Sequence, residues 1–390
     1  MTTPNSVDRE ARAALTAIVE PGTGVRVVRR VLAEGAGSVL GALRHGDAEL
    51  DPDGRLHRLA SAVDGAATLE RGAAADARFI CPGDPDWPAG LDGLELTLDA
   101  SARAVPPPLG LWVRGEPDLA EASRRSVAVV GSRAATEYGV RVAAEVAADL
   151  ATAGWTVVSG AAYGIDAAAH RGALAVGGTT VAILACGVDV AYPRGNAGLL
   201  HRIAGEGLLV SELPPGATPT RPRFLARNRL IAAITRGTVV VEAALRSGAL
   251  NTAGWAGDLG REVLAMPGPV TSSLSAGCHD LVRRAAAVLV TDAAEVVEMV
   301  GDLGTDAAVE ARGGDRPWDR LDPVVRDVLE ALPARRTVTV DRLCRETGVT
   351  AATCVAALGE LALAGLVVPD ADGWRLARNS GAAALRSVDS

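Results

Sequence analysis

The stretch that decides the fold reads Val127-Ala128-Val129-Val130-Gly131-Ser132-Arg133. Four apolar residues run into a glycine and an amphipathic helix pattern follows, which is typical of a buried strand that turns into a helix. At the carboxyl end of such a strand, main-chain N–H groups and the helix N-terminus attract anions. Ser132 adds a hydroxyl, and Arg133 adds a planar cation that suits phosphate. The stretch predicts a phosphate-binding turn; the alternative is an ordinary turn with Arg133 in a surface ion pair.

The same unit of a strand followed by a helix recurs from residue 121 to residue 300. We expect strands at Val127–Val130, Thr156–Ser159, Thr180–Ala185, Gly207–Ser211, Thr238–Glu242, Glu262–Ala265 and Val288–Val290. Repeated units of this kind predict an α/β fold, a doubly wound parallel sheet covered by helices on both faces. Ligands bind to such sheets at the rim formed by the loops after the strands.

Two smaller modules flank this region. Residues 1–75 predict a helical module, with helices at Ala11–Val19, Val25–Leu32, Ser38–Leu43 and Arg58–Ala66. It is of the sterile-alpha-motif or helix-hairpin-helix sort, and its turn Pro21–Gly24 either grips a DNA backbone or only packs. Residues 321–378 predict a winged helix, in which Asp341–Glu346 and Ala351–Ala364 form the helix-turn-helix and a short strand spans Val338–Val340.

Two connecting segments complete the chain. Residues 76–120 are a Pro-rich connecting segment in which Leu111–Val113 is expected as an edge strand, since proline runs do not fit helices or central strands. Residues 301–320 read as a linker, and the tail after Leu376 is expected to fray.

Composition narrows the class of protein. The 390 residues are 48% hydrophobic and carry a net charge of −8, so a basic patch must be local if phosphate is bound. Arginine supplies every basic residue apart from the histidines, and the absence of lysine excludes a P-loop and Schiff-base chemistry. The five cysteines are scattered, which argues against zinc and disulfides and fits the cytoplasm. We expect no signal peptide, no transmembrane helix and no membrane partner.

The loop after the second expected strand contains Ser159, Gly160 and Gly164, where the glycines allow a ligand to approach the backbone. Asp166 is interpreted as a helix cap and His170 as a structural residue. A catalytic triad of Ser159, His170 and Asp166 lacks the spacing of a nucleophile elbow. Cys186, after the third strand, is interpreted as a small buried residue and not as a nucleophile.

The segment from residue 221 to residue 246 concentrates positive charge. It contains Arg221, Arg223, Arg227, Arg229, Arg236 and Arg246, against the single acidic residue Glu242. Phe224 offers a ring for base stacking and Asn228 offers an amide, and arginines beside an exposed ring are the components of single-strand binding. The alternative is a solvated helix face. Ser247 and Gly248 then open another helix and complete one anion-binding rim with the earlier loops.

These motifs together resemble the DNA-processing protein A family, DprA, also called Smf. The collinear matches are Val129–Arg133, Ser159–Asp166 with His170, Cys186–Pro193, Arg227–Ala232, Glu242-Ala243, Ser247-Gly248, Thr252-Ala253 and Met266–Gly268. The resemblance implies an extended Rossmann-like domain with no catalytic residues and no cofactor. It implies that the domain binds single-stranded DNA, forms a homodimer and loads the RecA recombinase during natural transformation. On that basis Arg133, Phe224, Arg227, Asn228 and Arg229 are expected to contact DNA.

Departures and alternatives remain. Ala249, Cys278-His279 and Ala285-Ala286 differ from the family's usual residues, which puts local loop contacts in question. The helix at Ala351–Ala364 carries no basic residue, so we expect the winged helix to contact protein and not to read DNA. The alternative function is a phosphoribohydrolase-like enzyme on a related fold, although the Pro-Gly-Gly-x-Gly-Thr-x-x-Glu loop of such enzymes is missing. A sensor of small nucleotides is a third interpretation. No nicotinamide or flavin fingerprint is present.

Overall fold

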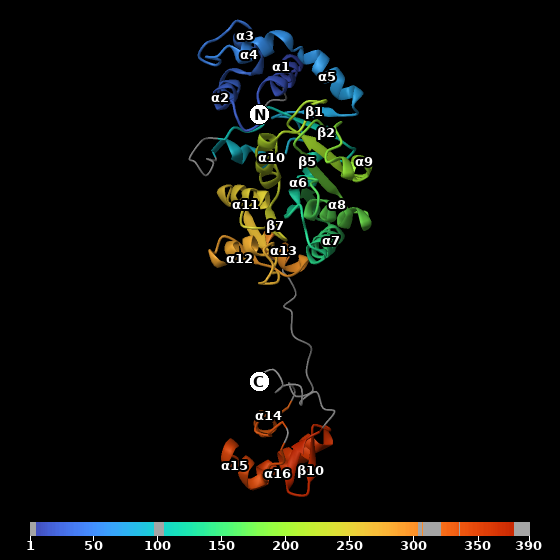
Figure 1. Cartoon of the computed structure of the whole chain (residues 1–390), viewed down its shortest axis with the longest axis vertical. Coiled ribbons are helices and arrows are strands. Elements are labelled where there is room, and N and C mark those ends of the chain that lie inside the picture. Colours follow the sequence, from blue (N-terminus) through green and yellow to red (C-terminus); the bar gives the residue numbers. More distant parts are fainter. Residues whose placement is uncertain (1–4, 97–104, 303–305, 307–320, 335, 378–390) are drawn as a thin grey trace. The chain divides into compact units, whose positions relative to one another are not determined.

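The computed structural model describes residues 5–96, 105–302, 306, 321–334 and 336–377. The chain divides into two compact units, Met1–Val309 and Glu310–Ser390, and each is described by itself (Figure 1). Most of the expected linker at 301–320 and nearly all of the tail after Leu376 lie outside the described residues.

One mixed sheet organises the first unit. Its strands within the described residues are β1 (Arg78–Ile80), β2 (Leu111–Arg114), β3 (Ser126–Val130), β4 (Thr156–Ser159), β5 (Thr180–Leu184), β6 (Leu208–Ser211), β7 (Gly237–Val240), β8 (Glu262–Ala265) and β9 (Val288–Leu289). Their order across the sheet is β1-β2-β6-β5-β4-β3-β7-β8-β9. The strands from β3 to β9 are parallel, as predicted, whereas β1 and β2 are antiparallel. The chain winds outward from β3 on one side and resumes beside it at β7, so the winding direction reverses between β3 and β7.

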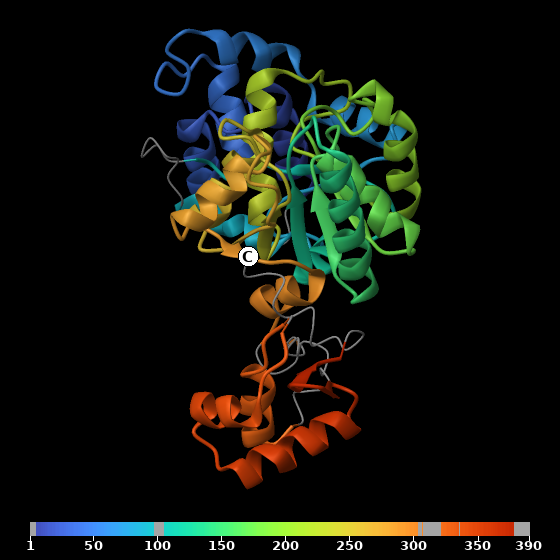
Figure 2. The same cartoon turned by 60° about the horizontal axis from the view of Figure 1, so that its bottom comes forward.

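Helices cover both faces of this sheet, because neighbouring strand residues point to opposite sides. Val127 and Val129 of β3 pack in the cluster that includes α7 (Glu137–Thr152), α8 (Ile165–Ala175) and α13 (Ala293–Val300), and α9 (Ala197–Glu206) continues that layer. Ala128 and Val130 pack in the opposite cluster. Its helices are α6 (Leu119–Arg124), α10 (Arg221–Ala233), α11 (Gly248–Asp258) and α12 (Ala276–Arg283). The predicted doubly wound α/β fold is therefore confirmed, and Figure 2 shows helices on either side of the central strands.

Two expected strands are wrong in detail. Leu111–Val113 is not an edge strand, since β2 pairs with β6 on one side and with β1 on the other. β1 has only three residues before Cys81-Pro82, so its apolar run was too short to indicate a strand. In the second unit, Val338 forms a single bridge with Trp374, and Val340 already begins a helix.

The N-terminal helical module has its own apolar core and packs on β2. Its helices are α1 (Ser6–Ile18), α2 (Val25–Glu34), α3 (Ala36–Arg44), α4 (Arg55–Ala62) and α5 (Gly65–Ala74). Helix α5 was not predicted. At Gly72 of α5, an added Cβ would lie 2.3 Å from the ring of buried Trp112, so only glycine lets this helix lie on the strand.

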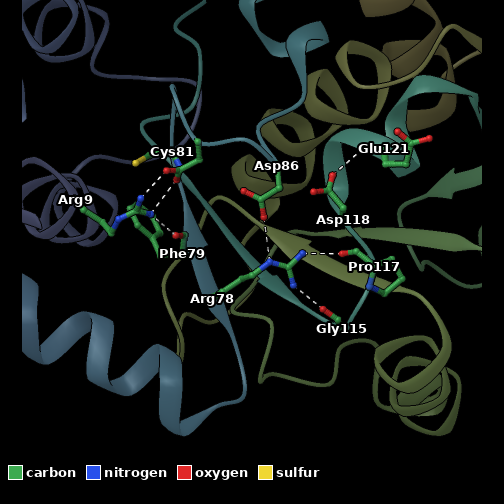
Figure 3. Close-up of polar contacts among 10 residues, drawn as sticks. Arg9, Arg78, Phe79, Cys81, Asp86, Gly115, Pro117, Asp118 and Glu121 are labelled. Atoms are coloured by element: carbon green, nitrogen blue, oxygen red, sulfur yellow. Dashed lines mark hydrogen bonds and ion pairs between the residues drawn. The ribbon is translucent and has the colours of Figure 1, made fainter. Parts of the chain in front are cut away.

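Two arginines bind the Pro-rich segment into this assembly (Figure 3). Arg9 of α1 donates to the Phe79 carbonyl at 2.8 Å and pairs with Asp84 through both terminal nitrogens. Arg78 of β1 donates to Asp86 and to the carbonyls of Gly115 and Pro117. A short 3₁₀ helix, Ala89–Leu96, packs its Leu91 and Leu94 into the main core. The segment is thus part of the sheet domain and not a detached tether.

The second unit has the predicted helix-turn-helix and wing. It comprises α14 (Pro323–Glu330), α15 (Val340–Thr347), α16 (Ala351–Leu363) and the hairpin of β10 (Val367–Asp370) and β11 (Gly373–Leu376). Gly348, at φ 74°, ends α15 in the left-handed conformation that favours glycine. The exposed side of α16 presents Val355 and Leu363.

Among the described residues, we find no helix that combines the length and the apolar character needed to cross a bilayer. The same residues contain no cluster of histidine, cysteine and carboxylate side chains suited to a metal ion.

Replacing Arg9 with alanine should destabilise the protein by about 2 kcal/mol, because Asp84 would lose its charged hydrogen-bond donor. Burial alone would raise the pKa of Asp84, but hydrogen bonds from Arg9 and the Cys81 amide outweigh it and lower that pKa. The stabilisation is therefore complete above about pH 4 and disappears as Asp84 is protonated in acid. Urea unfolding of R9A and wild type should show a gap that closes below about pH 4. Arg124→Ala, which breaks an exposed pair with Glu121, should leave the midpoint unchanged.

Candidate nucleic-acid interface

A pocket of about 410 Å³ lies at the carboxyl end of β3, where the winding of the sheet reverses. Open α/β sheets bind ligands at this position. The pocket is lined by Val130, Gly131, Ser132, Arg133, Ala134, Ala162, Asp166, Phe224, Leu225, Arg227, Asn228, Ile231, Ala244, Ser247, Gly248, Ala249 and Thr252. The turns that the sequence placed on one rim therefore converge, with contributions from the β3–α7 loop, α10 and the start of α11.

Contacts with Ile165 and Glu242 hold the β3–α7 loop in place. An added Cβ at Gly131 would lie 2.5 Å from the Ile165 side chain, and the Ser132 amide donates to the Glu242 carbonyl at 2.7 Å. The buried Glu242 carboxylate accepts from the amide and hydroxyl of Thr136 at 2.9 and 2.6 Å. Within the described part of the chain, the amides of Arg133 and Ala134 have no acceptor. Main-chain donors without a protein acceptor at the carboxyl end of a parallel strand can bind an anion.

Arg133 and two tilted aromatic rings form a partly exposed cluster beside this loop. The Arg133 guanidinium lies 4.9 Å from the centre of the Phe224 ring, and Tyr192 packs on Phe224 with ring centres 5.6 Å apart. Tyr192 is 41% exposed and Arg133 is exposed. Partly exposed aromatic rings with a neighbouring cation can accept an unpaired base and its phosphate.

Arg227 and Asn228 form the floor of the pocket. The Arg227 guanidinium is buried and donates to the carbonyls of Gly160 and Ile183 at 2.7 and 2.5 Å. Burial lowers its pKa, and the nearby Asp166 carboxylate opposes that effect. Asn228 accepts from Arg227 at 3.2 Å and donates to the Gly248 carbonyl and to Asn251 on α11. Both side chains hold α10 against the strand ends and α11. Only part of each side chain is therefore left to line the pocket.

Asp166 is a buried carboxylate at the side of the pocket. It accepts from the amides of Gly160 and Ala162 at 3.2 and 3.3 Å, and burial raises its pKa. The prediction that it caps α8 is wrong, because the N-cap is Gly164. Asp166 instead shapes the loop that precedes its own helix.

Four predicted contact residues do not line the pocket. The Ser159 hydroxyl donates to the Val129 carbonyl, and the Gly160 carbonyl accepts from Arg227. At Gly164 an added Cβ would lie 2.2 Å from the Ser132 carbonyl, which is a packing requirement between the two loops. Arg229 is buried and pairs with Glu212 through two contacts of 2.8 Å, so we withdraw it as a DNA contact.

The six arginines that lie between residues 221 and 246 of the sequence do not gather at one site in the structure. Arg223 pairs with Glu20 of the helical module, and Arg236 pairs with Asp302 near the opposite end of α10. Arg133, Arg221 and Arg246 are exposed and have no carboxylate partner within the described ranges. The positive charge that can reach a ligand is therefore smaller and more local than the sequence indicated.

Comparison with known proteins agrees with this geometry. Residues 78–301 match the family model for DNA recombination-mediator protein A, and residues 315–373 match the DprA winged helix domain. A DprA protein of Mycobacterium tuberculosis is 50% identical over 315 residues, covering 80% of each chain. DNA processing protein DprA of Streptococcus pneumoniae is 43% identical over 190 residues, 49% of this chain and 66% of the relative. A solved DprA structure from that organism aligns with a TM-score of 0.62 and 29% identity, over 77% of this chain and 100% of the other. The chain belongs to the DprA family.

The membership confirms the family that the motifs indicated and its winged helix. Membership in this family also assigns the chain a role in DNA processing. The positions of the side chains agree with the absence of a catalytic triad. His170 is buried against the Thr180 hydroxyl at 2.7 Å, and burial lowers its pKa to about 3. Cys186 donates to the Val190 carbonyl, and burial raises its pKa to about 11.

The sequence interpretation missed Tyr192 as a partner of Phe224. Its signal was the Tyr192-Pro193 dipeptide, which was noted only as a motif. Leu225 and Thr252, which also line the pocket, lie on helices next to predicted residues and carry no chemical signal of their own.

Replacing Arg229 with alanine should cost about 3 kcal/mol in unfolding free energy, because Glu212 would keep a largely buried charge without a partner. Urea denaturation measures this loss. Arg124→Ala removes an exposed arginine paired with Glu121 and should leave the unfolding midpoint unchanged. An R229A protein as stable as wild type would show that Arg229 does not carry the packing assigned to it.

Proposed function

We propose that the pocket at the end of β3 binds single-stranded DNA without sequence preference, and that the protein protects incoming DNA and loads RecA during natural transformation. The observation that carries the proposal is the cluster of Arg133, Phe224 and Tyr192 beside the free amides of the β3–α7 loop. Family membership supports the same role.

The arrangement suits a polynucleotide better than a small ligand. The free amides and Arg133 can hold a phosphate, while Phe224 and Tyr192 present ring surface to a base. Tyr192 and Leu225 extend the exposed surface beyond the phosphate loop, and two further arginines are exposed nearby in sequence, Arg221 at the start of α10 and Arg246 in the loop before α11. Ring faces accept every base, so sequence-independent binding follows.

The proposal does not include catalysis or a cofactor. Among the described residues that line the pocket, Asp166 is the carboxylate, and one of its oxygens already accepts two main-chain hydrogen bonds. Its role in shaping the loop accounts for its position. Release of free base from nucleoside monophosphates would overturn this part of the proposal and revive the phosphoribohydrolase alternative.

Replacing Arg133 with glutamate should weaken binding of an oligothymidylate about tenfold or more, because it removes a phosphate partner and adds a repelling charge. Phe224→Ala should weaken it about tenfold through lost stacking. Fluorescence anisotropy at two salt concentrations should show a shallower salt dependence for R133E only.

The matched control is Arg124→Glu, which makes the same charge change on α6, the helix that leads into the opposite end of β3. It should bind like wild type. Wild-type affinity in both R133E and F224A would remove the pocket from the proposal.

We infer that the chain forms a homodimer through the β9 edge of the sheet. β9 pairs with β8 on one side only, and Val288 and Leu289 are 42% and 48% exposed on it. Exposed apolar side chains at a sheet edge are typical of a contact surface for another protein chain. Val288→Asp should give a monomer by light scattering that still binds single-stranded DNA. A dimer in this variant would exclude the β9 edge.

RecA and the incoming strand meet in the cytoplasm, which we propose as the location of the protein. RecA loading would be measured as faster RecA filament growth on DNA already covered by single-strand-binding protein. No acceleration by the wild-type protein would contradict this part of the proposal.

A further inference from the structure

The N-terminal helical module touches the helix that carries the DNA-binding ring. Glu20 lies in the turn between α1 and α2, and Arg223 lies in the first turn of α10. Their side chains meet through two contacts, Nε to Oε2 at 3.0 Å and Nη2 to Oε1 at 2.7 Å. In Figures 1 and 2, the end of α10 nearest the module lies beside the blue helices.

The main chain of the same turn packs directly on α10. Gly22 has φ +73°, and an added Cβ would lie 3.1 Å from the Ala226 Cβ. The turn is closed by Thr23, whose amide and hydroxyl donate to the Glu20 carbonyl at 3.1 and 2.7 Å. Glu20 is therefore presented from a defined turn and not from a loose segment.

The first turn of α10 has few other supports. Its N-cap, Thr220, makes no side-chain cap hydrogen bond, and Arg221 and Pro222 are exposed. The continuous run of buried residues in α10 begins only at Arg227. Arg223 links this turn to Glu20 and also to the Thr218 carbonyl at 2.6 Å. Phe224, the next residue, is the half-buried ring that Arg133 and Tyr192 both contact.

We propose that Glu20 is a positioning residue for the single-strand site, holding Arg223 and thereby the first turn of α10 so that Phe224 presents its ring to a base. This inference rests on the proposed function of the pocket. The helical module then contributes to DNA affinity without touching DNA, because its turn at Pro21–Gly24 packs on α10.

The negative charge of Glu20 makes it possible to distinguish a positioning role from a purely electrostatic effect on DNA binding. A carboxylate close to a DNA site repels phosphate, so its removal should strengthen binding if charge alone matters. The hydrogen bond from Arg223 lowers the pKa of Glu20, so the carboxylate is ionised at neutral pH. A positioning role predicts the opposite result, because loss of the pair releases the turn that carries Phe224.

The test compares full-length Glu20→Gln with wild type by anisotropy on a labelled oligothymidylate. We expect E20Q to bind about fivefold more weakly, the size of one well-formed surface pair, with an unchanged salt slope. Arg223→Gln should also weaken binding, and E20Q/R223Q should bind no more weakly than R223Q, because the two side chains act as one unit. Glu34→Gln, in the same module and paired with Arg30, should bind like wild type.

Tighter binding by E20Q with a steeper salt slope would show that Glu20 only neutralises Arg223, and unchanged binding would show a surface ion pair without influence on the site. Either result overturns the inference while leaving the proposed function intact. Additive losses in the double variant also overturn it, and R223Q keeps the test decisive if E20Q disturbs its own turn. Failure of the wild-type protein to bind the oligonucleotide would instead overturn the proposed function.

Discussion

The site depends on one buried guanidinium. Arg227 is buried between the carboxyl ends of β4 and β5, where two main-chain carbonyls and the neighbouring Asp166 compensate its charge. A buried cation of this kind is stable only while its partners stay in place. It therefore sets the position of α10 on the sheet, and through Asn228 it also sets the start of α11. The helices that carry Phe224, Ser247 and Gly248 to the pocket both contact this anchor, Phe224's helix directly and the start of α11 through Asn228.

The layout also explains how an acidic chain can bind phosphate. Most arginines of the described chain that the sequence grouped together are occupied by carboxylates or carbonyls, as Arg223, Arg229 and Arg236 illustrate. The Arg133 guanidinium, by contrast, is exposed to solvent. It lies next to main-chain amides, which carry no net charge and so need no counterion. Fixed dipoles and a few free cations at a sheet end can produce a positive site on a negative protein.

The strand-helix alternation was predictable because each buried parallel strand is an uninterrupted apolar run ending at a glycine or a polar turn. The convergence of Gly131, Ser132, Arg133 and Ser247 followed from the rule that such turns share one rim. Arg227 and Arg229 could not be distinguished, since two residues apart on a helix they point to different sides. Both are buried, but Arg229 pairs with Glu212 and Arg227 binds the Gly160 carbonyl beside the pocket, and these partners are distant in sequence. The sequence pattern did not indicate strand β1 or helix α5. Arg9, which binds β1, and Trp112, on which α5 packs, are both distant in sequence from these elements.

The scarcity of aromatic residues in this chain has a spectroscopic consequence. The sequence has two phenylalanines and three tyrosines, and Phe224 and Tyr192 stand together at the pocket rim. Trp87, Trp112 and Trp155 are buried in the body of the first unit. Indole emission from these three side chains, together with the partly buried Trp255 on α11, reports on the packing of the first unit, whereas DNA bound at the pocket rim would contact phenol and phenyl groups, whose signals are far weaker. Occupancy of the site is consequently best followed from a dye on the nucleic acid.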